Sequence, residues 1–385
     1  MDHRLLTKAS AFAVAAAVAA SPALAQNDVS TLTDTIVITA TKKLNAENVQ
    51  DVPLAVTGYG EDQLNALKVR DLQDLTYSIP NVQLDDVGTI PGVANFAIRG
   101  LGVNSSIPSI DPTVGVFVDG MFLGINAGVV LDQFDIESIE ILRGPQGILF
   151  GRNVTGGAVV VNTKDAPDEF EGQIRGGVDS GLRGTGNNYY IMGSVGGPII
   201  EDKLNLKVAA YLNDDEGWFE NLNNPGENFG ERQTFLFRPS ILVRPTDNIE
   251  LNVKYEYGQN RGDGPAAQNH VNNAPGSGMG GPGFDRNTFD FAIDVEGFVD
   301  QRWDQVTAEL NWDVGFGDGR ITNVFSYRDY EASSQSDIDA SPVAGFESRA
   351  QIDQDQISNE LRYAGRFFDR MDLTAGVFFF TQDIG

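Results

Sequence analysis

The strongest constraint on the fold is a period of two that runs from about residue 170 to the end of the chain. Leu204, Leu206 and Val208 alternate with the polar Asn205 and Lys207. The pattern recurs, divided by turn residues, near 172–180, 187–196, 232–243, 251–257, 306–313, 320–330, 357–363 and 373–379. It predicts about nine antiparallel strands with one apolar and one polar face, which is typical of a transmembrane β-barrel whose apolar side chains face lipid.

A soluble β-sandwich also has one apolar strand face, so the alternation alone leaves that alternative open. Two further features favour the membrane. Tyr, Phe and Trp are frequent near the predicted strand ends, where a barrel carries its aromatic girdles. The predicted connections differ in length, from a tight turn at 245–248 to a Gly- and Pro-rich stretch at 261–300. Short periplasmic turns and long outer loops produce this asymmetry.

The first 25 residues have the features of a secretory signal peptide in the expected order. Arg4 and Lys8 precede an apolar run from Ala9 to Ala20, and an Ala-x-Ala cleavage site ends at Ala25. The run is shorter than the ~20 residues that a transmembrane helix needs, and no later segment supplies them. We therefore expect an exported chain that begins at Gln26 after cleavage.

The composition excludes several kinds of site. The chain has no cysteine and only two histidines, His3 and His270. A disulfide framework, a thiol nucleophile and a histidine-rich metal site are therefore excluded. The formal net charge of −27 argues against nucleic acid as a partner, because phosphate binding needs cations. No nucleophile–base motif is recognisable, so we predict no enzyme, no catalytic residue, no metal and no cofactor.

A short β-branched run lies near the predicted N-terminus of the exported chain. It consists of Asp34, Thr35, Ile36, Val37, Ile38, Thr39 and Ala40. Such a run is a strong strand former. Polar residues flank it on both sides, and no obvious neighbouring strand exists in the sequence. The run is therefore a candidate for pairing with a partner protein by strand addition.

Residues 45–165 predict a compact domain of mixed structure. Leu64, Leu67, Val69, Leu72 and Leu75 recur at roughly helical spacing, which predicts a helix over 61–75. Short strands are predicted at 96–99, 114–119, 136–142 and 158–161, with Gly-rich turns between them.

Four stretches of this chain resemble the TonB-dependent outer-membrane receptors. Residues 34–40 resemble the TonB box, and Asn95 to Gly102 resembles the Phe-x-Ile-Arg-Gly strand of the plug domain. Residues 116–120, Val-Phe-Val-Asp-Gly, resemble a plug turn and are also a hairpin signal. The most specific match is Glu137 to Ala158, which resembles the family's Ile-Glu-x-Leu-Arg-Gly-Pro block, with Phe150 in place of the usual tyrosine.

The resemblance implies a mainly β fold in which a mixed α/β plug precedes an antiparallel transmembrane barrel. The expected parts are a signal peptide at 1–25, an N-terminal segment with the TonB box at 26–44, the plug at 45–165 and barrel strands at 166–385. The implied plug-motif residues are Arg99, Gly100, Asp119, Gly120, Glu137, Glu140, Arg143, Gly144, Pro145, Gly151, Arg152, Gly156 and Gly157.

The resemblance also implies roles for the charged residues. Arg99 is expected to be a buried cation that needs carboxylate partners. Arg143 and Arg152 are expected to pair with acidic groups of the plug or the barrel wall, with Glu137 and Glu140 as candidates. These pairs are either a latch that loosens during transport or static contacts of the core.

The function implied is active import across the outer membrane of a Gram-negative bacterium, with plug and TonB box facing the periplasm. The expected partners are TonB with its inner-membrane complex, outer-membrane lipid and lipopolysaccharide, and a small ligand. The resemblance favours a ferric siderophore as that ligand, and oligosaccharides, cobalamin and aromatic compounds stay open. A passive porin and a signalling receptor are alternatives, although a porin has no use for a plug. A signalling receptor of this family has a further domain before the TonB box.

The number of strands predicts an incomplete barrel. The family's transporters resemble barrels of about 22 strands with a plugged lumen, whereas about nine strands are predicted in this sequence. We therefore expect these residues to be part of a longer protein, and we expect that alone they neither insert stably nor transport.

Overall fold

The computed structural model describes residues 37–385, apart from 45–46, 51, 88–91, 104–106, 108, 126, 129–133, 181–185, 271–282, 286 and 369. The predicted signal peptide and residues 34–36 of the predicted TonB box lie outside these residues. Among the described residues, no helix has the length and apolarity needed to cross a membrane.

A five-stranded sheet forms the centre of the first domain. Its strands, in spatial order, are β3 (Val56–Gly60), β9 (Ile136–Arg143), β10 (Gly157–Thr163), β7 (Val114–Val118) and β8 (Met121–Phe122). β10 is parallel to β7 and antiparallel to β9. β7 and β10 are nearly continuous runs of buried residues, which fits strands that are covered on both faces.

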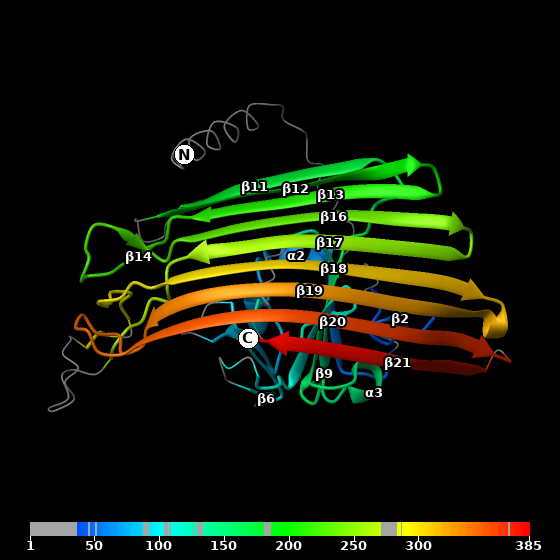
Figure 1. Ribbon diagram of the computed structural model, residues 1–385, viewed down its shortest axis with the longest axis horizontal. Helices are drawn as coiled ribbons and strands as arrows, with labels where there is room; N and C mark the ends of the chain where they lie inside the picture. Colours follow the sequence, from blue (N-terminus) through cyan, green and yellow to red (C-terminus); the bar gives the residue numbers. More distant parts are fainter. Residues whose placement is uncertain are drawn as a thin grey trace. The chain divides into compact units, whose positions relative to one another are not determined.

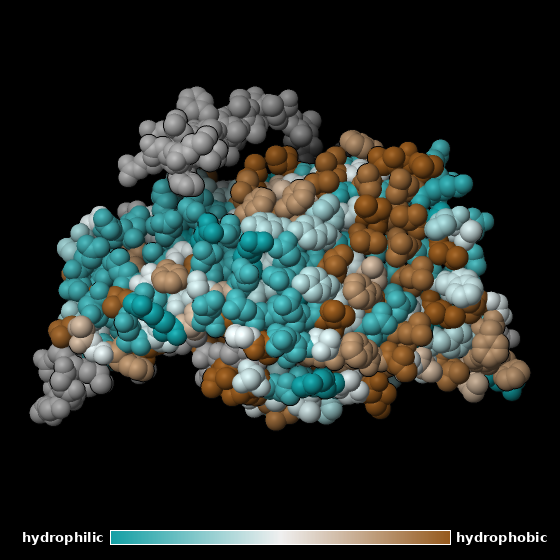
Figure 2. Space-filling model, viewed as in Figure 1, coloured by the Kyte–Doolittle hydropathy of each residue, from teal (hydrophilic) through white to brown (hydrophobic). Residues whose placement is uncertain are grey.

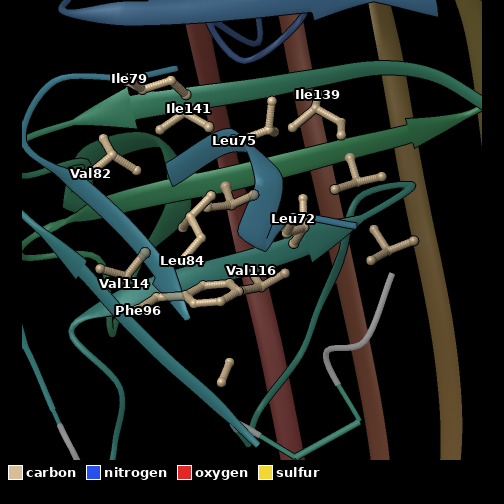
Figure 3. Close-up of a cluster of buried hydrophobic side chains, with 14 of the residues drawn as sticks. Leu72, Leu75, Ile79, Val82, Leu84, Phe96, Val114, Val116, Ile139 and Ile141 are labelled. Carbon is tan, nitrogen blue, oxygen red and sulfur yellow. The ribbon is translucent and has the colours of Figure 1, made fainter. Parts of the chain in front are cut away.

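Smaller elements pack over this sheet and close the core. They are α2 (Glu61–Ala66), the 3-10 helix η1 (Gln73–Tyr77), β4 (Val82–Asp86), β5 (Ala94–Ile98) and β6 (Leu101–Gly102), where β4–β5–β6 form a second sheet. Figure 3 shows Leu72 and Leu75 turned toward Leu84, Val116 and Ile139 in one apolar cluster. The predicted strands of this domain are confirmed within a few residues at each end.

The predicted helix over 61–75 is wrong in its length. The α-helix ends at Ala66, and a separate 3-10 helix begins at Gln73. Lys68 between them has φ +54°, in the left-handed region that ends a helix. Val69, Leu72 and Leu75 are still buried, so the apolar spacing reflects contact with the core rather than one continuous helix.

Nine long strands form a single antiparallel sheet, which we call the wall. They are β11 (Glu171–Ser180), β12 (Asn187–Ile200), β13 (Leu204–Asp215), β16 (Arg232–Thr246), β17 (Ile249–Gly262), β18 (Phe298–Val314), β19 (Gly319–Asp337), β20 (Glu347–Phe367) and β21 (Met371–Ile384). Each wall strand pairs with the next one along the chain (Figure 1). This confirms the predicted number of strands and the short turn at 245–248.

The two faces of the wall differ as the alternation predicts. On β13, Asn205, Lys207 and Ala209 are buried, whereas Val208 and Leu212 are exposed. Figure 2 shows apolar side chains gathered over the wall strands toward the end where β16 turns into β17. The exposed face is thus apolar. The opposite face meets the first domain through buried polar side chains and through an apolar cluster that includes Phe134, Tyr211 and Trp303.

Candidate functional site

The end of the predicted TonB box is paired within this chain. Val37 and Ile38 form β1, which is antiparallel to β2 (Glu47–Asn48), with Val37 opposite Asn48 and Ile38 opposite Glu47. Ile38 is fully buried. The prediction that this strand lacks a neighbour is therefore wrong for its described part, since a partner strand follows only a few residues later.

Glu140 holds the two residues that follow β1. Its carboxylate accepts hydrogen bonds from the backbone amides of Thr39 and Ala40, each at 2.9 Å, and from the Thr39 hydroxyl at 2.9 Å. Asn162 Nδ2 approaches the same carboxylate at 3.4 Å. Glu140 is fully buried on β9, between β3 and β10 in the plug sheet. It therefore joins the N-terminal segment directly to that sheet.

Lys42, in the same N-terminal segment, contacts the wall. Its Nζ lies 2.6 Å from Glu360 Oε2 on β20 and 4.6 Å from the centre of the Phe150 ring. Burial lowers the pKa of Lys42, and the nearby Glu360 carboxylate opposes that shift. The segment from β1 to Lys42 thus contacts both the sheet of the first domain and the wall.

The block from Glu137 to Ala158 folds as two strands joined by a compact loop. β9 leads into the short helix α3 (Gly147–Phe150), and β10 returns beside β9. The Gly144 amide donates to the Gly156 carbonyl at 2.9 Å, which closes the loop. Gly157 has φ +155°, and a Cβ there would lie 2.2 Å from the Leu142 carbonyl oxygen. Only glycine fits this close approach of β10 to β9.

The three arginines of the motif follow the prediction only in part. Arg99 is exposed just after β5, and among the described residues no carboxylate pairs with it. Arg152 pairs with Asp111 at 2.7 Å, in an exposed contact, rather than with Glu137 or Glu140. Arg143 lies beside Tyr59, whose pKa is raised by burial and lowered in part by this guanidinium. The expectation that Arg152 pairs with an acidic group of the plug is therefore confirmed, but the partner is neither of the two candidates, and no described carboxylate pairs with Arg143.

The positions of Arg99, Glu137 and Glu140 explain these differences. Arg99 follows the buried Ile98, so the alternation along β5 already places it on the face away from the core, and its φ of +55° ends the strand there. Glu137 is exposed on β9, and Glu140 is occupied by Thr39 and Ala40. The remaining motif positions, Gly100, Gly144, Pro145, Gly151 and Gly156, lie in the turns next to β5, β9 and α3.

The hairpin predicted at Asp119–Gly120 is confirmed, and it also reaches the wall. Both turn residues have positive φ, 48° and 80°, as a two-residue hairpin of type I′ requires. The Asp119 carboxylate accepts from Thr163, at 2.9 Å from its amide and 2.7 Å from its hydroxyl, and from Lys254 Nζ of β17 at 3.0 Å. Burial alone would raise the pKa of Asp119, but Lys254 and the Thr163 hydrogen bonds hold it below its ordinary value.

A second buried network joins Asp135 to the wall. Lys207 Nζ of β13 lies 2.7 Å from Asp135 Oδ2. Arg238 of β16 donates to the Phe134 carbonyl at 3.0 Å and, through Nε, to Glu256 at 2.9 Å. All these charged side chains are buried, so each depends on its partners for stabilisation.

A third set of contacts uses wall amides and backbone carbonyls. The Gly124 amide donates to Gln356 Oε1 at 2.9 Å, and Gln356 Nε2 donates back to the Phe122 carbonyl. Arg328 of β19 donates to the Gly128 carbonyl at 3.2 Å. These wall residues are not among the site residues predicted from the sequence. The sequence pattern that could have found them is a charged or amide side chain at an inward-facing position on several neighbouring strands.

Comparison with known proteins agrees with this geometry. Residues 48–158 match the family model of the TonB-dependent receptor plug domain. The chain is similar to the pesticin receptor of Yersinia pestis, with 25% identity over 222 residues, which are 58% of this chain and 31% of that protein. It is also similar to the ferrioxamine B receptor of Salmonella typhimurium, with 25% identity over 235 residues, 58% of this chain and 30% of that protein.

Solved structures extend the likeness to the wall. The ferric yersiniabactin uptake receptor of Yersinia pestis superimposes with a TM-score of 0.71 at 18% identity, over 86% of this chain and 48% of that one. A siderophore receptor of Acinetobacter baumannii gives 0.68 at 18% identity, over 89% of this chain and 47% of that one. The chain spans about a third of the length of the curated relatives.

These relatives are receptors rather than enzymes, and they agree with the predicted location in the outer membrane of a Gram-negative bacterium. Residues 48–158 thus match the TonB-dependent receptor plug domain, and together with the wall they have the fold seen in solved siderophore receptors.

Proposed function

We propose that this chain is the plug and part of the barrel wall of a receptor that imports an iron chelate with energy from TonB. The observation that carries the proposal is the attachment of Thr39 and Ala40 to Glu140. A partner that draws a strand from residues 34–40 applies its force next to this carboxylate. Because Glu140 lies on β9, inside the five-stranded plug sheet, the force reaches the plug directly.

The polar contacts between plug and wall suit a plug that moves, and they lie beside a smaller apolar cluster that spans the two. At Asp119, Asp135 and Gly124 the plug meets the wall through hydrogen bonds and ion pairs, which water can replace when the surfaces separate. The main apolar cluster lies inside the plug itself. Displacement of the plug therefore leaves much of its own core together.

A ferric siderophore is the favoured ligand, because related receptors are named for pesticin, hemin and ferrioxamine B and solved relatives for siderophores. Oligosaccharides, cobalamin and aromatic compounds are the alternatives within the same energised mechanism. Lipopolysaccharide is a proposed neighbour of the exposed apolar face of the wall.

The test is deletion of residues 34–40 from the complete receptor, with deletion of residues 27–33 as a control of equal length. Radioactive iron uptake from a panel of siderophores is measured in hosts with and without TonB. We expect the first deletion to abolish uptake, as loss of TonB does, while surface binding of the chelate persists. Uptake that survives both the deletion and the loss of TonB would favour a passive channel.

A further inference from the structure

Two adjacent rows of buried polar side chains cross the inner face of the wall. We call them the inner belt. The register aligns the first row as Lys207, Ser240, Lys254, Thr307, Ser326 and Ser358. The second row lies two residues from the first on each strand from β16 to β20, and it consists of Arg238, Glu256, Gln305, Arg328 and Gln356. Every member is buried.

The inner belt is rich in cations, although the whole chain carries a net charge of −27. It holds Lys207, Arg238, Lys254 and Arg328 but a single carboxylate, Glu256. With the plug in place, three acidic groups from outside the belt complete the balance. Asp119 and Asp135 come from the plug, and Asp165, 2.7 Å from Lys254, comes from the segment that joins plug and wall.

Arg328 stands apart from these ion pairs. Its guanidinium meets the carbonyls of Ala127 and Gly128 and the amide oxygen of Gln354. Its Nε and the neighbouring Tyr330 hydroxyl, both fully buried, have no hydrogen-bond partner within the described part of the chain. A buried cation without a carboxylate is an unusual choice for a contact whose only role is to hold two domains together.

Movement of the plug changes this balance. Asp119, Asp135 and the carbonyls that face Arg328 leave with the plug, whereas the four cations stay on the wall. The belt together with Asp165 then has four cations and two carboxylates, a net charge of 4 − 2 = +2. A small pocket already lies where Asp119 meets Arg238, Lys254 and Gln305.

We propose that the inner belt is an internal binding site for an anionic ligand, which replaces the plug carboxylates as the counter-ion of these cations while it passes. The proposal rests on the proposed function, and it specifies the substrate class as iron chelates with net negative charge. The guanidinium forks of Arg238 and Arg328 suit carboxylate or phenolate oxygens, and Ser240, Thr307 and Ser326 add neutral hydrogen bonds.

The test uses the complete receptor in planar lipid bilayers, with urea on one side to displace the plug reversibly. The reversal potential in a potassium chloride gradient measures the charge selectivity of the open state, and citrate serves as a small anionic probe of the site. We expect citrate to reduce the current in the unaltered receptor. Arg328→Gln and Lys207→Gln/Lys254→Gln should weaken that block by roughly tenfold and shift selectivity toward cations.

Glu256→Gln gives the opposite prediction, namely stronger citrate block and greater preference for anions. Heat-modifiable migration on gels checks that each variant is folded. Loss of structure would not shift citrate block and ion selectivity in opposite directions in the two kinds of variant, so opposite shifts identify an effect of charge. An open state whose selectivity and citrate block are the same in all variants overturns the proposal. If urea opens no channel and deletion of residues 34–40 leaves uptake intact, the proposed function itself fails.

Discussion

Lys42 Nζ lies 2.6 Å from Glu360 Oε2, although 318 residues separate the two in sequence. Both side chains are largely buried, so the pair fixes the N-terminal segment against β20. Four residues earlier, at Ile38, the same segment ends β1. The region that is proposed to meet TonB is therefore bound at both ends of its described part.

We expect Glu360→Gln to loosen this segment. Loss of one partner of a largely buried ion pair leaves Lys42 without its counter-charge. Because the chain has no cysteine, Lys43→Cys gives a single attachment point for a nitroxide label, and its electron paramagnetic resonance spectrum should narrow in the Glu360→Gln background. Glu347→Gln, on an exposed part of the same strand, is the matched control, and equal narrowing in both would contradict the role of Glu360.

Glu140→Ala should release Thr39 and Ala40 from the plug. Three hydrogen bonds at 2.9 Å are lost, at a cost of about 1–3 kcal/mol for the docked state. The affinity of the segment for the periplasmic domain of TonB should then rise, because docking to Glu140 no longer competes. Calorimetric titration measures the change, and unchanged or weaker TonB binding would argue against competition.

Asp119 gives the contact between plug and wall a defined pH dependence. Its pKa in the folded protein lies below the ordinary value, so its stabilising effect is complete above about pH 4, the unfolded value. The effect is lost as pH falls through the lower folded pKa. Compared with Asp119→Asn, the unaltered protein should keep a higher thermal midpoint at pH 7 and lose that difference in strong acid. Asp247→Asn, in the turn after β16, is the control, and its thermal midpoint should stay close to that of the unaltered protein at both pH values.

Gly157→Ala should destabilise the plug, since the added Cβ meets the Leu142 carbonyl at 2.2 Å and φ is +155°. Overpacking of this kind costs about 1–3 kcal/mol. Gly147→Ala is the matched control in the same loop, because a Cβ there has nothing within 4 Å. Limited proteolysis of the plug should be faster for Gly157→Ala alone, and equal rates for the two variants would show that the approach of β10 to β9 tolerates a side chain.

Local pattern predicts much of this fold. Alternation along β13 and β17 predicts which face of the wall is apolar, and Asp119–Gly120 predicts a hairpin, because both depend on near neighbours in sequence. The partner of a buried charge depends instead on residues a hundred or more positions away. Glu140 was expected to face an arginine and instead accepts backbone amides from Thr39 and Ala40. Arg99 was expected inside, but it directly follows the buried Ile98 and so lies on the outer face of β5.

The pairing order of the wall also has a kinetic consequence. Each wall strand pairs with the next in sequence, so the sheet can grow one hairpin at a time through contacts of low sequence separation, which form quickly. Lys42 emerges early in synthesis, but its partner Glu360 belongs to β20, near the far end of this sequence. The contact between them therefore forms late, because it requires that the wall has been assembled as far as β20.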